Sequence, residues 1–348
     1  MDIEAKMELA RRAPTEEIIM EQELRELFST KDHPNHYIGY EISGKLHLGS
    51  LIVCGYKIKD LIDAGCNCTV FLADWHAFIN NKLDGNWDAL KKAGNYYREA
   101  FQLISPKIKI VVGSELYHNN DSFWKNVVMI GKHATVARVT KCLPIMGRSE
   151  GELNETSFLL YPLMQCADIK EMSIDIAHSG MDQRKAHMLA RDVFPKLSWK
   201  PPIALHNSLL GGLAKPEGSE TAKMGKSMPW TCIFIHDSKA EIKEKMNKAW
   251  CPDKTAEGNP VLNYVKNIVF HDFSSFEVNR PSKFGGDVDY SSYSEVEKDY
   301  VNGKLHAADL KSAVAVYLNK IVQPYREHFE KPAKAKLLDV YNDSKITR

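Results

Sequence analysis

The chain has 348 residues, of which 44% are apolar and 26% charged, a composition typical of a globular protein with more than one packing unit. Its formal net charge is +1, so a polyanionic partner must be bound by local basic patches rather than by a field of the whole molecule. The seven cysteines form no CxxC pair, and we expect reduced core thiols in a cytoplasmic protein. No apolar run reaches the roughly 18 residues of a membrane span, and the charged N-terminus is unlike a secretory signal.

The first half of the chain alternates between two kinds of apolar pattern. Residues 1–30 have apolar side chains at helical spacing and predict an N-terminal helical arm with a break at Pro14. Short apolar strands and amphipathic helices then alternate at 36–41, 48–63, 68–74, 87–103 and 107–113. Strands that alternate with helices in this way predict a Rossmann-type α/β domain with a parallel sheet.

The middle of the chain is expected to complete this α/β domain. Residues 121–170 predict inserted helices, and a strand at 172–177 and a helix at 181–194 follow. Residues 196–222 are rich in proline, glycine and polar side chains, which favours a surface excursion. The stretch 214–229 has almost no apolar residues and is interpreted as a mobile loop.

The character of the sequence changes after a last expected strand at 232–236. Residues 238–348 contain helical patterns separated by joints rich in glycine, proline and aspartate. We therefore expect a domain boundary near 237. The Rossmann-type domain would cover 31–237, and an all-helical domain would cover 238–348.

A glycine-rich turn lies between Tyr37 and Ser50, with the sequence YIGYEISGKLHLGS. An apolar strand enters a loop with Gly39, Gly44 and Gly49, and a helical pattern starts just after His47. Glycines let a backbone approach a ligand closely, and the N–H groups at a helix start favour phosphate. The loop is neither GxGxxG nor a P-loop. Taken alone, it fits an ordinary strand-to-helix turn as well as a nucleotide site.

Two further segments fit the same kind of site. Residues 177–183 read AHSGMDQ, again a strand followed by Gly180 and by polar residues that open a helix. The loop at 214–229 carries Lys223 and Lys226. Because strand ends of a doubly wound sheet meet at one crevice, two such turns would hold a nucleoside while the dibasic loop meets its phosphates.

Two signatures connect these segments to a known family. Residues 47–50 (HLGS) resemble the HIGH signature, and residues 223–227 (KMGKS) resemble the KMSKS signature, of class I aminoacyl-tRNA synthetases. The words FLADWHA, YPLMQCADI, GMDQRKAHMLAR and CPDKTAEGNPVL are similar to tyrosyl-tRNA synthetases of the archaeal and eukaryotic type, a resemblance that covers essentially the whole chain. Ser50 and Gly225 depart from the usual signatures, which contain histidine and serine at these positions.

The resemblance implies activation of L-tyrosine by ATP, giving tyrosyl-adenylate and pyrophosphate, and transfer of tyrosine to the 3′ end of tRNA(Tyr). It also implies a homodimer that uses Mg²⁺ with ATP, without protein metal ligands and without a tightly bound prosthetic group. The attacking carboxylate is already ionised at neutral pH, so no general base is required. Catalysis would rest on alignment and on neutralising charge at the phosphates.

The resemblance also assigns roles to individual residues. The catalytic phosphate donors would be His47, Lys223 and Lys226. The ATP-binding residues would be Gly39, Gly49, Ser50, Gly180, Asp182 and Ser227. The tyrosine-binding residues would be Tyr37, Glu41, His76, Tyr161, Gln165, Asp168 and Gln183. The tRNA-binding residues would be Lys141 and Arg184 at the acceptor end, and Phe284, His306 and Asp309 at the anticodon.

One part of this assignment also follows from helical spacing. Tyr161, Gln165 and Asp168 are separated by four and three residues, so they share one face of a helix. Buried polar groups need partners, and three of them on an otherwise apolar face favour a polar ligand over a core helix with polar ends. Helix capping is the competing role for His47 and for Asp182.

Two alternative functions remain open at this stage. The first is the tryptophan homologue, although Asp168 together with Tyr37 favours a phenol over an indole. The second is a catalytically silent RNA-binding protein on a synthetase scaffold. The presence of His47 argues against a catalytically silent protein, whereas the departures at Ser50 and Gly225 keep this alternative open.

Overall fold

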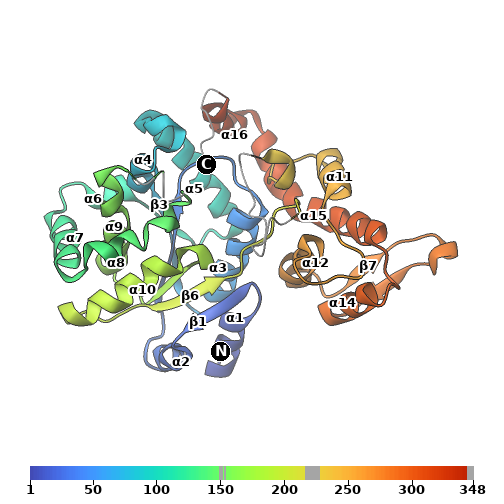
Figure 1. The fold of residues 1–348 in the computed structure, drawn as a ribbon, viewed down its shortest axis with the longest axis horizontal. Helices are drawn as coiled ribbons and strands as arrows, with labels where there is room; N and C mark the ends of the chain where they lie inside the picture. The colour runs from blue at the N-terminus through green and yellow to red at the C-terminus, as the bar shows by residue number, and fades with distance from the viewer. Residues whose placement is uncertain (149–151, 153, 216–227, 343–348) are drawn as a thin grey trace. The chain divides into compact units, whose positions relative to one another are not determined.

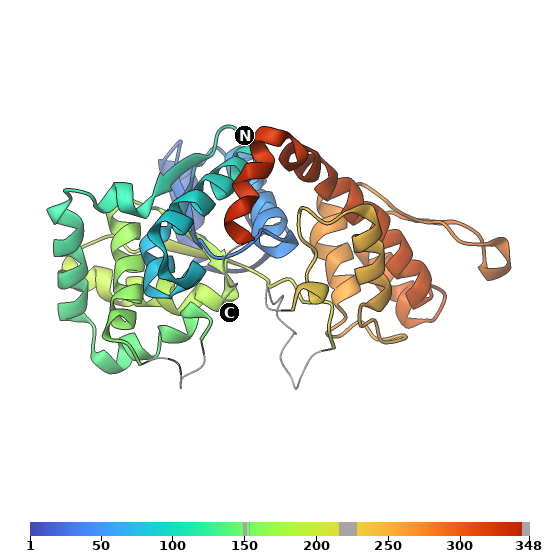
Figure 2. The same cartoon turned by 90° about the horizontal axis from the view of Figure 1, so that it is seen from above.

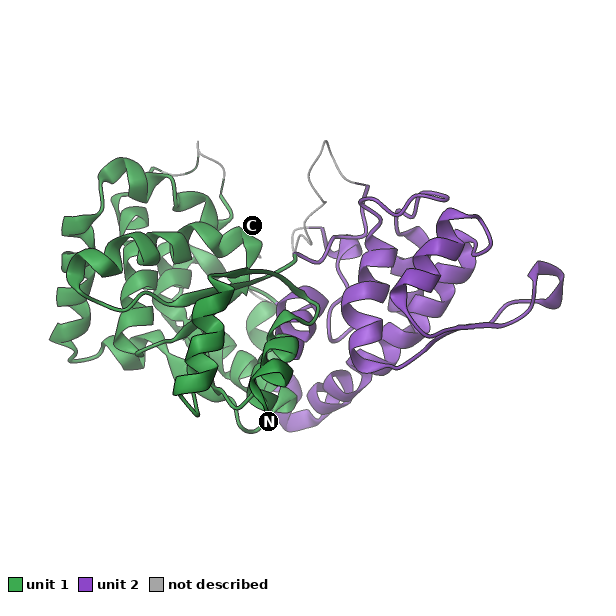
Figure 3. Ribbon diagram, turned by 90° about the horizontal axis from the view of Figure 1, so that it is seen from below, with its two compact units in different colours: residues 1–44, 57–208, 337–348 green, residues 45–56, 209–336 purple. Residues whose placement is uncertain are grey.

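The computed structural model describes residues 1–148, 152, 154–215 and 228–342. The chain divides into two compact units, shown in different colours in Figure 3. The first consists of Met1–Gly44, Lys57–Ser208 and Leu337–Arg348, and the second of Lys45–Tyr56 and Leu209–Lys336. The glycine-rich turn is thus split between the units after Gly44, and the division does not follow the boundary expected near 237.

The first unit is built around a six-stranded sheet. Its strands are β1 (Thr15–Ile19), β2 (Asn35–Glu41), β3 (Asn67–Ala73), β4 (Lys109–Val112), β5 (Ile176–Gly180) and β6 (Ile203–Asn207). Their order is β1-β6-β5-β2-β3-β4, with β1 antiparallel to β6 and all other neighbours parallel. The predicted Rossmann-type parallel sheet is therefore confirmed.

The strand order places a ligand crevice at a defined point of this sheet. From β2 the chain proceeds outward to β3 and β4, and it then returns to form β5 and β6 on the other side of β2. In doubly wound sheets, ligands bind outside the carboxyl ends of the strands where the order reverses. Here that point lies beyond Glu41 of β2 and Gly180 of β5, at two of the turns singled out in the sequence.

Helices connect and cover these strands (Figure 1). They are α1 (Ile3–Arg11), α2 (Glu21–Thr30), α3 (Cys54–Asp63), α4 (Asp74–Ile79), α5 (Trp87–Ile104), α6 (Gly113–Tyr117), α7 (Asp121–His133), α8 (Val136–Thr140), α9 (Leu160–Glu171) and α10 (Arg184–Val193). Helices α7 to α9 lie in the segment 121–170 predicted as a helical insertion, and α7 packs against α9. The apolar faces of α6, α7 and α9 share one core with Phe71 and Ala177 of the sheet.

Two segments of the first unit differ from the prediction. Thr15–Ile19, expected to be helical, forms edge strand β1 after Pro14, because the segment pairs with β6 and three of its residues, Thr15, Ile18 and Ile19, are β-branched. Ile203–Asn207, expected in a surface excursion, is a completely buried strand. Its five residues are too few to show a strand pattern beside Pro201 and Pro202, and the pairing with β1 and β5 decides its structure.

The second unit is helical, as predicted, with one addition. Its helices are α11 (Lys239–Lys248), α12 (Pro260–Tyr264), α13 (Phe270–Asp272), α14 (Tyr293–Val301), α15 (Ala307–Glu330) and α16 (Pro332–Ala335). The addition is an antiparallel pair, β7 (Phe276–Val278) and β8 (Val288–Tyr290), whose connecting segment extends away from the helices of its unit (Figure 2). Among the described residues, no helix is long and apolar enough to cross a membrane.

The strand predicted at 232–236 is reduced to one bridge. Phe234 pairs with His47, and the flanking backbone hydrogen bonds join Leu48 to Ile233 and Ile235 to Leu46 at 3.0 and 3.2 Å. His47 and Phe234 both belong to the second unit. The apolar run therefore holds the start of the HLGS turn instead of extending the sheet.

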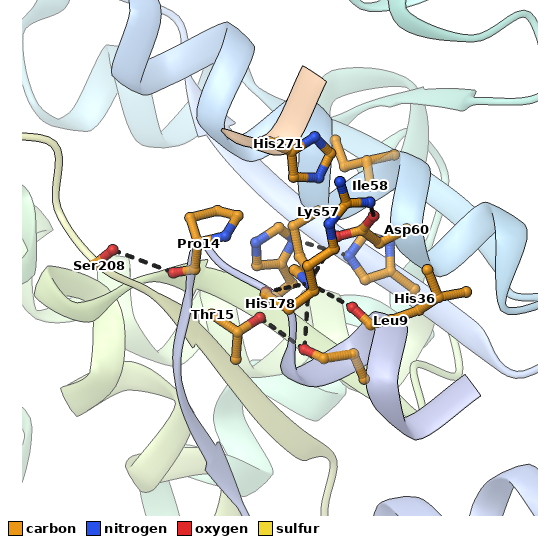
Figure 4. Close-up of polar contacts among 12 residues, drawn as sticks. Leu9, Pro14, Thr15, His36, Lys57, Ile58, Asp60, His178, Ser208 and His271 are labelled. Carbon is orange, nitrogen blue, oxygen red and sulfur yellow. Dashed lines mark hydrogen bonds and ion pairs between the residues drawn. The ribbon is translucent and has the colours of Figure 1, made fainter. Parts of the chain in front are cut away.

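A buried lysine of α3 binds the end of the N-terminal helix α1 within the first unit (Figure 4). Lys57 of α3 donates from Nζ to the carbonyl oxygens of Leu9 and Arg12, near the end of α1, at 2.7 and 2.8 Å. It also donates to Oδ2 of Asp60 at 2.9 Å, and its side chain is 0% exposed. Burial lowers the pKa of Lys57 to about 8. The last carbonyls of a helix lack hydrogen-bond donors within the helix, and Nζ of Lys57 is the donor for those at the end of α1.

We expect Lys57→Met to lower the free energy of unfolding by about 3 kcal/mol, the lower end for a broken buried ion pair. It removes the main cation of the buried Asp60, which keeps the 3.4 Å contact with Arg12, and the donor to the carbonyls of Leu9 and Arg12. Lys59→Met, at an exposed position two residues along the same helix, is the matched control and should change stability by about 0.5 kcal/mol or less. Urea denaturation followed by circular dichroism measures both. Equal effects of the two substitutions would show that the buried contacts do not stabilise the fold.

Candidate active site

The first unit contains a cluster of buried polar side chains around Tyr37 and Asp168, which we call the polar pocket. Tyr37 of β2 and Asp168 of α9 are both 1% exposed. The hydroxyl of Tyr117, the last residue of α6, donates to Oδ1 of Asp168 at 2.6 Å. Burial raises the pKa of the Asp168 carboxyl well above its ordinary value, and the Tyr117 hydrogen bond lowers it in part. Asp168 lies near enough to Tyr37 to affect its phenol, so the structure brings these two expected residues together, whereas Tyr117 did not emerge from the sequence.

Several polar atoms of this pocket have no hydrogen-bond partner among the described residues. They include both ring nitrogens of His76 and Oε1 of Gln165. His76 Nε2 lies 3.8 Å from Oδ2 of Asp168, and burial lowers the pKa of His76 to about 4, so the ring is neutral. Burial also raises the pKa of the Tyr37 phenol, and the nearby Asp168 raises it further. Unpartnered buried polar atoms are costly, which favours a polar ligand at this position.

A second group of polar residues surrounds Glu41 at the end of β2. Tyr161 donates its hydroxyl to Oε1 of Glu41 at 3.3 Å, and Asn80 donates to the same oxygen at 2.6 Å. Nζ of Lys82 lies 3.6 Å from Oε2 of Glu41. The guanidinium of Arg148 donates to the backbone carbonyl of Asn80 at 2.6 Å and so supports this arrangement. The pairing of Glu41 with Tyr161 agrees with the expected set, and Asn80, Lys82 and Arg148 are additions.

The turn after β5 carries three further predicted residues, Gly180, Asp182 and Gln183. Gly180 ends the strand, Asp182 is exposed, and Gln183 is half-buried. Nε2 of Gln183 donates to the carbonyl of Ile145 at 2.8 Å and lies 3.3 Å from Oδ2 of Asp182. Asp182 makes no helix-capping hydrogen bond, so the alternative role considered for it is not observed.

The HLGS turn lies in the second unit, where His47 caps the helical segment Leu48–Val53. Nδ1 of His47 accepts from the backbone N–H of Ser50 at 3.3 Å. The Ser50 hydroxyl in turn accepts from the backbone N–H of His47 at 3.0 Å and donates to its carbonyl at 3.2 Å. Because a neutral imidazole carries one proton, an accepting Nδ1 leaves Nε2 as the donor. Ser50, expected as an ATP ligand, therefore forms a capping box with His47.

Two predicted glycines border these groups. A side chain at Gly49 would meet the His47 ring at 3.3 Å, so the missing Cβ lets the imidazole lie against its own turn. Gly39 is exposed, and a Cβ there would meet the Tyr37 ring at 3.5 Å. Lys223, Lys226 and Ser227 lie outside the described residues.

The residues expected at the tRNA acceptor end differ in their surroundings. Lys141 is exposed at the end of α8. Arg184, at the start of α10, forms a bidentate pair with Glu17 of β1, with bonds of 2.8 and 3.0 Å. His206 of β6 contacts the same carboxylate through Nδ1 at 2.9 Å, and its Nε2 faces Nδ1 of His187 at 3.1 Å. Glu17, which the sequence did not indicate, thus orients Arg184.

The expected anticodon readers lie in the second unit. Phe284 is 59% exposed in the segment between β7 and β8, with Nζ of Lys283 4.9 Å from the centre of its ring. His306 caps α15 by accepting from the N–H of Ala308 at 3.2 Å, and Asp309 follows in the first turn of this helix. An exposed aromatic ring is suited to stacking on an unpaired base.

Known proteins resemble the chain over almost its full length. A family model described as tRNA synthetases class I (W and Y) matches residues 29–323. The chain is 43% identical to the tyrosine–tRNA ligase of Thermococcus kodakarensis, with 100% of both chains covered. The crystal structure of tyrosyl-tRNA synthetase from Pyrococcus horikoshii, complexed with L-tyrosine, has a TM-score of 0.91 and 40% identity, covering 97% of this chain and 100% of that one.

The fold is shared more widely. Tryptophanyl-tRNA synthetase of Plasmodium falciparum has a TM-score of 0.69 at 16% identity, covering 98% of this chain and 91% of that one, a likeness of fold alone. The order of the sheet, the buried polar cluster of Tyr37 and Asp168 and the family match define a class I aminoacyl-tRNA synthetase. Within that class, the chain belongs to the tyrosine–tRNA ligase family, which it matches along its whole length at 40–43% identity.

Proposed function

We propose that the protein activates L-tyrosine with ATP and transfers it to tRNA(Tyr), with the phenol bound by the pocket of the first unit. The observation that carries the proposal is the buried group of Tyr37 and Asp168, which offers an acceptor for a phenolic hydroxyl. A buried site built around a hydroxyl group rejects the analogue that lacks it, because the polar groups of the site then stay unpaired. An indole presents a single N–H from a larger ring and suits this group less well.

The other end of the amino acid requires acceptors for an ammonium group. Glu41 is a carboxylate at the end of β2, and Oε1 of Gln165 is a buried acceptor without a partner among the described residues. We propose that these two groups, with Tyr161 and Gln183 beside them, hold the α-ammonium. The substrate carboxylate would then be fixed in position for in-line attack on the α-phosphate of ATP.

Activation transfers the adenylyl group without a general base, since the carboxylate is ionised at neutral pH. The bond from the carboxylate oxygen to the α-phosphorus forms, and the bond to the bridging oxygen of pyrophosphate breaks. We propose that His47 donates from Nε2 to the phosphates and that Gly180 and Asp182 hold the ribose. We also propose that Lys223 and Lys226 neutralise the negative charge of the leaving pyrophosphate.

Mg²⁺ would enter with ATP. His47 and the two loop lysines are donors and cations, which suit phosphate oxygens and do not suit direct coordination of a hard cation. The phosphates and water would therefore supply most ligands of the ion, which neutralises phosphate charge when bound. We further propose a homodimer, and we place the protein in the cytoplasm, in keeping with its seven free cysteines.

For the transfer step we expect Arg184→Ala to reduce kcat/KM for tRNA about 10- to 100-fold, as loss of one specific nucleic-acid contact would. Glu17→Gln should reduce it less, because it loosens the orientation of Arg184 and keeps its charge. Amino acid activation, measured by pyrophosphate exchange, should stay at the wild-type level in both variants. A parallel loss of exchange would show that the pair supports the fold rather than tRNA binding.

ATP–pyrophosphate exchange measured with each of the twenty amino acids in turn tests the proposed substrate. Tyrosine alone should drive exchange at a high rate. Exchange driven by tryptophan would assign the chain to the other substrate of the family, and exchange with none would support the catalytically silent alternative.

A further inference from the structure

The short hydrogen bond between Tyr117 and Asp168 has no counterpart in the roles assigned above. Tyr117 ends α6, directly beyond strand β4, and is 4% exposed. Its hydroxyl donates to Oδ1 of Asp168 at 2.6 Å. The other carboxylate oxygen, Oδ2, forms no hydrogen bond within the described part of the chain, and its measured neighbour is Nε2 of His76 at 3.8 Å. The two oxygens of Asp168 are therefore in different environments.

Tyr117 is held in place by aromatic packing. Its ring stacks on Phe123 with a centroid distance of 3.9 Å and contacts Trp75 and Trp124 edge-on at 6.0 Å. A Cβ at Gly113, at the start of α6, would lie 3.3 Å from the Tyr117 ring, so the missing side chain there permits this packing. A ring enclosed on several sides keeps its position. The hydroxyl is thus a fixed part of the pocket.

We propose that Tyr117 is a specificity-determining residue, a resident phenol that occupies Oδ1 of Asp168 and presents Oδ2 to the phenol of the substrate. This inference rests on the proposed function and extends it by one residue. A carboxylate oxygen that is buried without any donor is expensive to keep ionised. The Tyr117 hydroxyl supplies one donor in the unliganded pocket, and the substrate hydroxyl supplies the second on binding.

The electrostatic environment of Asp168 agrees with this division. Asp74 and His76 of α4, Tyr117 of α6, Tyr37 of β2 and Cys166 of α9 face the carboxyl group. Burial and the charge of Asp74 raise the pKa of Asp168, and the Tyr117 hydroxyl lowers it. His76 is neutral because burial lowers its pKa to about 4. Tyr117 is therefore the residue whose hydrogen bond favours the ionised form of Asp168.

Tyr117→Phe tests the proposal, because it keeps the aromatic packing and removes the hydroxyl. Without this donor the pKa of Asp168 rises, so the acidic limb of kcat/KM for tyrosine should move to higher pH. At neutral pH the KM for tyrosine should increase about 10-fold, the value for loss of one hydrogen bond to a charged group. The preference for tyrosine over phenylalanine should fall, because a protonated Asp168 penalises a missing hydroxyl less. The KM for ATP should not change.

Tyr56→Phe is the matched control. Tyr56 is also a buried phenol that donates to a carboxylate, Oδ2 of Asp272, at 2.7 Å in the second unit. Its loss should leave the pH profile and the tyrosine preference unchanged. An unshifted pH profile and an unchanged KM in Tyr117→Phe would overturn the proposal.

Infrared spectroscopy of the unliganded protein separates this proposal from the proposed function. The band of the protonated Asp168 carboxyl group, assigned with an Asp168→Asn variant, should persist to higher pH in Tyr117→Phe than in the wild type. Identical titration of the band in both proteins would contradict the role of Tyr117. This result does not depend on whether the wild type activates tyrosine.

Discussion

Asp168→Ala is expected to lower kcat/KM for tyrosine about 100- to 10,000-fold, with the affinity for ATP unchanged. The substitution removes the buried acceptor of the substrate hydroxyl and leaves the Tyr117 hydroxyl without its partner. Loss of a hydrogen bond to a charged group, together with an unsatisfied buried donor, costs about 2.5–6 kcal/mol. Pyrophosphate exchange at varied tyrosine concentrations measures the first quantity, and calorimetric titration with a non-hydrolysable ATP analogue measures the second.

Asp63→Ala, at an exposed position of α3, is the control and should match the wild type in both assays. If Asp168→Ala retained the wild-type kcat/KM for tyrosine, the phenol would have to bind elsewhere. Joint loss of tyrosine activation and ATP binding would indicate a collapsed site rather than a lost contact.

His47→Ala is expected to slow adenylate formation about 100- to 1,000-fold, the range for removing one preorganised donor from a developing negative charge. Tyrosine binding should persist, because His47 is assigned to the phosphates. The capping box with Ser50 fixes which nitrogen of the ring carries the proton, so the effect should lie in the rate and not in the KM for tyrosine. Stopped-flow measurement of the first turnover gives this rate directly.

His47→Asn separates the two roles of this residue. Asparagine is a good N-cap, so this variant should keep the helix start and still lose the phosphate donor. Equal losses in His47→Ala and His47→Asn support the donor role, with His118→Ala, an exposed histidine, as the control. Wild-type activity in His47→Asn would show that His47 acts only as a helix cap.

Much of the fold could be predicted from the sequence, because its strands are buried apolar runs flanked by amphipathic helices. Strand β2 and helix α5 lie within one residue of their expected bounds. The failures occur where tertiary pairing decides the structure. Thr15–Ile19 and Ile203–Asn207 are short strands that pair with each other, and the residue pattern of neither segment reveals this pairing.

The candidate site was predictable where spacing alone brings residues together. Gln165 and Asp168 share a helix face, as their spacing indicates, whereas the nearness of Tyr37 to them was expected only from the family resemblance. Tyr117 comes from a different helix, and only the packing of α6 against the sheet brings it to Asp168. Its one visible signal is its place just beyond the carboxyl end of a predicted strand. Glu17 carried no signal, since the segment around it was interpreted as helix.

Ser50 shows how a departure from a signature can be explained by local geometry. The sequence left its role open because serine has no titratable ring. In the structure its backbone N–H donates to Nδ1 of His47 and so leaves Nε2 as the donor. Its hydroxyl bonds the backbone N–H and carbonyl of His47 and closes the capping box. Ser50→Ala keeps the backbone N–H on the His47 ring and removes the hydroxyl, so it tests the contribution of the capping box to the backbone of His47.

The most direct test of the central assignment is aminoacylation of a tRNA(Tyr) transcript with radiolabelled tyrosine. The account predicts tyrosine attached to the 3′ end, at a yield that depends on ATP and is abolished by Asp168→Ala. Absence of charged tRNA with the wild-type protein, or charging with tryptophan in place of tyrosine, would contradict it.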